Sequence, residues 1–144
     1  LLEFAALHGF YQEVGKKLND ALFDGIRSSS HEKVSVMLCH GVEAEIKDEA
    51  GRSALAVCVE EGHGAKIARV LLEHGANPDG RDSADVPIAF YALLRQDREV
   101  FKLLANFGLN FNLAEPTTGE TVWDNARDNG WNEDELRALF KRGG

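Results

Sequence analysis

The octet Ala68-Arg-Val-Leu-Leu-Glu-His-Gly75 has two relatives in the chain, Val34-Ser-Val-Met-Leu-Cys-His-Gly41 and Phe101-Lys-Leu-Leu-Ala-Asn-Phe-Gly108. Their final glycines recur at a nearly constant spacing of about 33 residues. Together with Ile67 and Val100, the apolar residues recur at i, i+3 and i+4, as one face of an α-helix requires. A glycine after the last turn can take the left-handed conformation that ends a helix. Each octet is therefore predicted to be a short amphipathic helix with its own stop signal.

The segment after each glycine also repeats. An extended, turn-rich connection ends in an acid: Asp48, Asp82 or Glu115. A second short helix is expected just after, with Ser53 or Thr121 as a favourable cap and Pro87 at the start of the middle copy. The repeating unit is thus a turn, a helix, a short turn, a helix and a long loop, with a period of about 33 residues.

With this order and period, the chain resembles the ankyrin repeat family. Residues 65–79 are similar to the family's second helix and the loop after it, and residues 51–63 to its turn and first helix. The resemblance covers about residues 20–142 and implies an all-α ankyrin-repeat solenoid of about four helix-turn-helix repeats. Ser53-Ala-Leu-Ala56 replaces the family's Thr-Pro-Leu-His start, so the histidine that braces neighbouring repeats is missing there. Another such start lies near Val86-Pro-Ile-Ala89. There the sequence allows two alignments of residues 86–96 with the repeat, which differ by one residue.

The resemblance also divides the chain. The repeats are predicted over residues 20–47, 48–81, 82–114 and 115–144, the first with an irregular leading helix over 20–27. The last closes with a mostly polar helix, which suits the end of a stack because no neighbour covers its outer side. Residues 1–19 are predicted to form an N-terminal capping helix, and a partner-binding or targeting element is the alternative.

The composition narrows the class of function. The 144 residues carry 24 acidic and 16 basic side chains, a formal net charge of −8. This disfavours nucleic acid as a partner, because basic groups are needed to displace counterions from phosphates. No apolar run approaches the ~20 residues that span a bilayer, so we expect a soluble protein, monomeric when free. The chain starts at Leu1 without an initiator methionine, which leaves the compartment open: the cytoplasm is favoured, and the periplasm or secretion is the alternative.

No residue pattern indicates catalysis, a cofactor or a metal. Cys39 and His40 are adjacent on a predicted helix, where neighbours do not face each other, so a thiol enzyme that uses Cys39 is the weakest hypothesis. Cys58 is expected to pack against a neighbouring repeat. The five histidines form no metal-binding pattern, and no phosphate-binding or nucleophile motif is present. We predict no enzyme, no cofactor and no metal site.

The resemblance implies where a partner docks, because ankyrin proteins usually bind through a concave face made by the hairpin tips and the first helices. Carried over to this chain, the partner-binding residues on the tips are Glu49, Arg52, Ser83, Asp85, Thr117 and Glu120. On the first helices they are Glu60, Glu61, Leu94 and Asn129, with Leu93 and Asp128 beside them.

Aromatic residues are considered as anchors because they dominate many interfaces. Phe90 and Trp123 are expected in the core. For Tyr91 the sequence favours neither core nor surface. Trp131, which follows the last glycine of its turn, is expected to be exposed. Tyr91 and Trp131 are therefore included among the predicted partner-binding residues.

The resemblance thus implies a non-catalytic protein-protein interaction module that acts as an inhibitor, an immunity factor or an adaptor. Because complementary charge guides encounter, the partner is expected to present a basic or mixed-charge patch to the acids of this face: Glu49, Glu60, Glu61, Asp85 and Glu120. The second hypothesis is an ankyrin segment or structural subunit of a larger catalytic or scaffold protein.

Overall fold

The computed structural model describes residues 18–143, with side chains as far as Leu139. Its helical segments are residues 18–27, α2 (His31–Cys39), α3 (Ala54–Glu61), α4 (Ala65–Glu73), α5 (Ile88–Leu94), α6 (Arg98–Asn106), α7 (Val122–Asp128) and α8 (Glu133–Gly143). Among the described residues, β-type pairing is limited to isolated bridges at the bases of the hairpins: Lys47–Ser53, Arg81–Pro87 and Ala114–Thr121. The predicted all-α helical repeat fold is confirmed. The capping helix predicted over residues 1–19 lies outside the described residues, apart from its last two positions.

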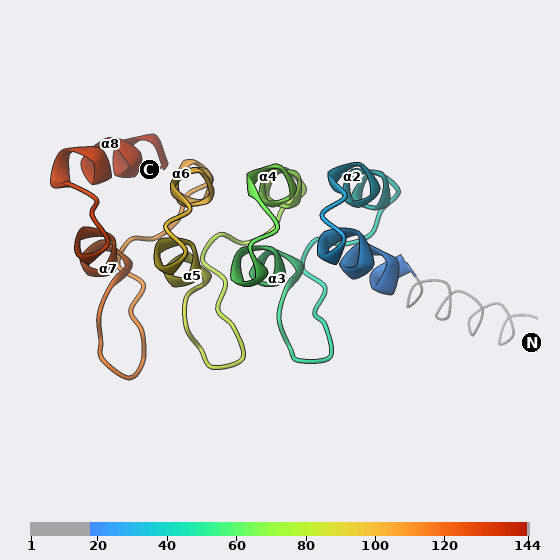
Figure 1. The fold of residues 1–144 in the computed structure, drawn as a ribbon, viewed down its shortest axis with the longest axis horizontal. Helices are drawn as coiled ribbons and strands as arrows, with labels where there is room; N and C mark the ends of the chain where they lie inside the picture. The colour runs from blue at the N-terminus through green and yellow to red at the C-terminus, as the bar shows by residue number, and fades with distance from the viewer. Residues whose placement is uncertain (1–17, 144) are drawn as a thin grey trace, which may run out of the picture.

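Figure 1 shows the helices in two rows, with long loops extending beyond the second row. We call α2, α4, α6 and α8, which form the first row, the outer helices. We call α3, α5 and α7, which lie in the second row with residues 18–27, the inner helices. The loops are hairpins whose tips are residues 48–52, 82–86 and 115–120. The inner face is the surface made by the inner helices and these tips.

The helix pairs pack on their neighbours rather than around one centre. The inner helix α3 buries every residue from Ala54 to Val59, because it contacts both α4 of its own pair and α5 of the next. An outer helix buries only one stripe, which in α4 consists of Ile67, Ala68, Leu71 and Leu72. No polar or charged residue of the described part of the chain is buried. Since each pair supplies only part of a core, the pairs are stable as a stack.

Local signals begin and end the helices. Ser53 Oγ accepts the backbone N–H of Ala56 at 3.1 Å, and Thr121 Oγ1 accepts that of Asp124 at 3.2 Å, so both predicted caps are confirmed. Asp97 caps α6 in the same way. The glycines that follow the outer helices all have positive φ: 97° at Gly41, 96° at Gly75 and 95° at Gly108.

Two expectations about the helices are corrected. The leading helix of the first unit, predicted to be irregular over residues 20–27, is a regular helix over 18–27. Leu93, predicted on the inner face, is buried at 2% exposure, whereas its neighbour Leu94 is 74% exposed. The cause is helical periodicity: Leu93 lies one turn after the buried Ala89 and therefore on the core side of α5.

Candidate partner-binding face

An acid at the start of each hairpin tip fixes the turn that follows it. Asp48 Oδ1 accepts the backbone N–H groups of Ala50 at 3.0 Å and Arg52 at 2.9 Å. Asp82 Oδ1 accepts the N–H groups two and four residues further on, both at 2.9 Å. Glu115 accepts those two and three residues on, at 3.0 and 2.8 Å, and these bonds lower its pKa to about 2. Side-chain bonds of this kind mimic a backbone turn, so each tip has a defined shape.

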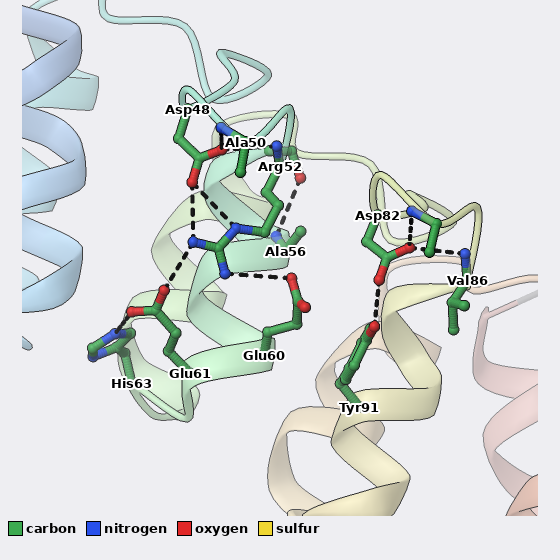
Figure 2. A network of polar contacts seen from close by, with 12 residues as sticks. Asp48, Ala50, Arg52, Ala56, Glu60, Glu61, His63, Asp82, Val86 and Tyr91 are labelled. Carbon is green, nitrogen blue, oxygen red and sulfur yellow. Dashed lines mark hydrogen bonds and ion pairs between the residues drawn. The ribbon is translucent and has the colours of Figure 1, made fainter.

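Arg52 joins the first tip to the inner helix α3 (Figure 2). Its guanidinium lies 3.1 Å from Asp48 Oδ2, 3.7 Å from Glu60 Oε2 and 3.1 Å from Glu61 Oε2. Glu61 Oε1 lies in turn 3.1 Å from His63 Nε2. The side chain of Asp48 is 7% exposed and that of Arg52 is 22% exposed, so solvent screens these pairs less than ordinary surface pairs.

The three carboxylates around Arg52 differ in their pKa values. Burial raises the pKa of Glu60, and the charge of Arg52 offsets this only in part. Burial acts in the same direction on Asp48, but the hydrogen bonds and charge of Arg52 outweigh it and hold that pKa below its ordinary value. The hydrogen bond with His63, followed by the influence of Arg52, lowers the pKa of Glu61. Arg52, Glu60 and Glu61, all predicted to bind a partner, are thus engaged with one another inside the chain.

Tyr91 links the second tip to the inner helix α5 by different chemistry. Its hydroxyl donates a hydrogen bond to Asp82, the acid that holds this tip (Figure 2). Burial and this bond raise the pKa of Tyr91 well above its ordinary value. The sequence left open whether Tyr91 lies in the core or on the surface. The ring is half-buried and packs against the edge of the core.

A hollow of about 210 Å³ lies on the inner face between α5 and α7. Its lining residues are Val86, Phe90, Tyr91, Leu94, Asn125 and Asn129. Leu94 is strongly exposed there, and Asn129 Nδ2 donates hydrogen bonds of 2.8 and 3.0 Å to the backbone and side-chain oxygens of Asn125. Sequence reasoning missed Val86 and Asn125 as lining residues. The repeat spacing could have found Asn125, which lies one repeat period after Tyr91.

The remaining predicted tip residues are accessible to solvent. Glu49, Ser83, Asp85 and Thr117 are exposed, and Glu120 is half-exposed. Arg81 fastens the second tip to the next unit, because its Nη1 donates hydrogen bonds to the carbonyl oxygens of Asp85 at 2.8 Å and Ala114 at 2.9 Å. That the five tip residues named first in this paragraph contact a partner stays a prediction.

Trp131 is buried, with 5% exposure, so the prediction that it is an exposed anchor is wrong. Its backbone N–H donates a hydrogen bond of 3.1 Å to the carbonyl oxygen of Ala126, within the turn that joins α7 to α8. The ring centroid lies 5.0 Å from that of Phe101, and the guanidinium of Arg98 lies 4.0 Å from the indole centroid. Phe90 and Trp123, the two aromatic residues that were expected in the core, are half-buried and pack against it.

The thiols form no dyad within one helix. Cys39 Sγ lies 3.9 Å from Nε2 of His74, the residue that caps the C-terminus of the next outer helix, α4. Cys58 is buried, and burial raises its pKa to about 12, which keeps the thiol protonated at neutral pH. In the described part of the chain, no group of three or more His, Cys, Asp or Glu residues is placed to hold a metal ion.

Stacked helix pairs whose hairpins project from one side define the class of the protein, and comparison with family models agrees. Residues 5–115 match the family described as ankyrin repeats (3 copies), and the chain belongs to the ankyrin repeat family. Ankyrin repeats are generally protein-protein interaction modules and are typically non-catalytic. A search of curated proteins gives no match. None of the helices described for residues 18–143 is long and apolar enough to cross a membrane.

Proposed function

We propose that this protein is a non-catalytic binding protein that holds another protein against its inner face, as an inhibitor, immunity factor or adaptor. The observation that carries the proposal is the row of hairpin tips, each held by its own acid and each presenting exposed side chains on the same side as the inner helices. A fixed surface loses little conformational entropy on binding, which favours affinity.

Charge supports a partner with a basic or mixed-charge patch. Glu60 and Glu61 lie around Arg52 and are compensated inside the chain. Glu49 and Glu120 form no ion pair with the described side chains, and Asp85 has only a 3.9 Å contact with Arg81 at 70% exposure. The uncompensated negative charge of the inner face therefore lies at the tips and at Asp128, the last residue of α7. The net charge of −8 argues against nucleic acid as the partner.

The test compares two triple variants with the same change in charge. The first converts inner-face acids to lysine (Glu49→Lys, Asp85→Lys, Glu120→Lys), and the second converts exposed acids outside the inner face (Glu43→Lys, Glu73→Lys, Glu99→Lys). Partners captured from the source cell by wild-type protein are identified by mass spectrometry and their affinities measured against salt. The first variant should lose the partner and its salt dependence, whereas the second should keep both. Equal behaviour of the two variants would refute the proposed face.

A further inference from the structure

The inner face carries three equivalent residue pairs, each formed by the end of a hairpin tip and a position eight residues further on. The repeat period relates the pairs to one another: Arg52 with Glu60, Val86 with Leu94, and Glu120 with Asp128. The first pair is an internal ion pair, the second is apolar and the third consists of two acids. The surface therefore changes character from one unit to the next.

The apolar pair borders the hollow between α5 and α7. Leu94 is 74% exposed, against 49% for Val36 and 39% for Phe107, the other large apolar side chains exposed in the described part of the chain. Burying a side chain of this size on binding is favourable, and the neighbouring hollow of about 210 Å³ offers room for one bulky apolar group from a partner.

The acidic pair adjoins the same hollow. Asn125 and Asn129 line the hollow, and Asp128 is the last residue of α7, directly before Asn129. The hydrogen bond with Asp128 raises the pKa of Glu120. Among the side chains described as far as Leu139, no Lys or Arg pairs with Glu120 or Asp128, since the neighbouring Arg127 pairs with Asp124 and Glu133 instead. Arg52, the cation that accompanies acids in the second unit, has no counterpart here.

We propose that the inner face binds a peptide segment of a partner protein that places a bulky apolar side chain in the hollow beside Leu94 and a lysine or arginine between Glu120 and Asp128. This inference rests on the proposed function and specifies the chemistry of the partner. Charge favours such a segment over a second copy of this chain, because two copies that each carry a charge of −8 repel one another.

The test uses the full chain and a display library of random short peptides. Selection should enrich peptides that combine a bulky apolar residue with a nearby lysine or arginine. Leu94→Ser should weaken their binding about tenfold, and the double variant Glu120→Gln, Asp128→Asn about fivefold at low salt, with a flatter salt dependence. The matched control, Val36→Ser on the outer helix α2, should change the affinity less than about twofold. Leu94, Asp128 and Val36 are exposed and Glu120 is half-exposed, and thermal unfolding verifies that each variant folds.

The outcomes separate this inference from the proposed function. Peptides without the apolar and basic pair, peptides that bind Leu94→Ser as well as wild type, or the absence of any enriched peptide would overturn the inference. Enriched peptides that lack the apolar and basic pair can still bind the triple variant Glu49→Lys, Asp85→Lys, Glu120→Lys more weakly than wild type. In that case the inner face remains the binding surface, and only the proposed chemistry of the bound peptide is wrong.

Discussion

Arg95 reaches back from the third helical unit to the second, where its Nε donates a hydrogen bond of 2.8 Å to the carbonyl oxygen of Glu60. Glu60 lies in the last turn of α3, where the helix itself leaves carbonyl groups without a partner. Gly62, which ends α3 with a φ of 73°, lies against the same guanidinium: a Cβ at this position would be 2.6 Å from Arg95 Nη1. Gly62 therefore supplies a left-handed backbone conformation, and any side chain at this position would displace the guanidinium of Arg95.

Gly62→Ala should lower the free energy of unfolding by about 2 kcal/mol, from left-handed strain together with displacement of Arg95. Gly51→Ala is the control, because Gly51 also has positive φ, 81°, but a Cβ there would meet nothing within 4 Å. It should cost only about 1 kcal/mol in the same urea titration. In an Arg95→Ala background the two costs should become equal, and a persistent excess at Gly62 would contradict the role of Arg95.

Arg52→Met should destabilise the protein by about 2 kcal/mol, because it removes the cation that lies among three carboxylates. Of these, Asp48 keeps an ion pair with Arg27 at 3.3 Å, whereas Glu60 and Glu61 lose their arginine partner. The control is Arg69→Met, which removes an exposed i,i+4 pair with Glu73 (65% and 53% exposed side chains) and should change the free energy of unfolding by less than about 0.5 kcal/mol. Chemical denaturation of both variants at neutral pH makes the comparison. Similar effects would mean that the Arg52 cluster contributes no more than a surface pair.

Two acids around Arg52 should affect stability with opposite dependence on pH. The pKa of Asp48 is lowered in the fold, so its ionised form stabilises the protein above the ordinary value of 3.8, and this contribution is lost as the pH falls through the lowered pKa. The pKa of Glu60 is raised, so its contribution is present below the ordinary value of 4.5 and is lost as the pH rises through the raised pKa.

Asp48→Asn should therefore destabilise the protein at pH 7 by about 1 kcal/mol, with the difference from wild type shrinking under acid conditions. Glu60→Gln should leave the protein as stable as wild type or more stable at pH 7, and should match it below the ordinary pKa. Denaturation of the three proteins across this pH range measures both effects. Loss of stability at pH 7 in Glu60→Gln would show that its ion pair with Arg52 outweighs its burial.

The helical units were predictable from the sequence because their signals are local. Apolar spacing, the caps Ser53 and Thr121, and the glycines after the outer helices each act within a few residues. The middle unit was harder to predict because it has no glycine at the end of its inner helix. At the position where the second unit has Gly62, the middle unit has Gln96, which adopts the left-handed conformation with a φ of 56°. Without that glycine as a marker, the sequence could not separate the buried Leu93 from the exposed Leu94.

The candidate site was less predictable because its residues interact across elements. The positions of Glu60 and Glu61 on α3 were predicted correctly, but their shared partner Arg52 comes from the preceding hairpin tip and contacts them only once the turn is formed. The same reason applies to Trp131. A tryptophan after a glycine turn looks exposed in the sequence, whereas its environment is set by Phe101, which belongs to another unit.

Trp131→Ala should destabilise the last unit most, because the indole packs on Phe101 and Arg98 and so joins the last unit to the one before it. Removing a buried tryptophan costs about 3–4 kcal/mol. In a stacked array this cost falls mainly on the nearest pairs, so amide hydrogen exchange should accelerate in α7 and α8 while α3 and α4 remain protected. Trp131→Phe, which keeps a ring against Phe101, should recover much of the loss. Trp123→Ala, at a half-buried site, should cost less, and equal acceleration along the whole chain after Trp131→Ala would show that the units unfold as one.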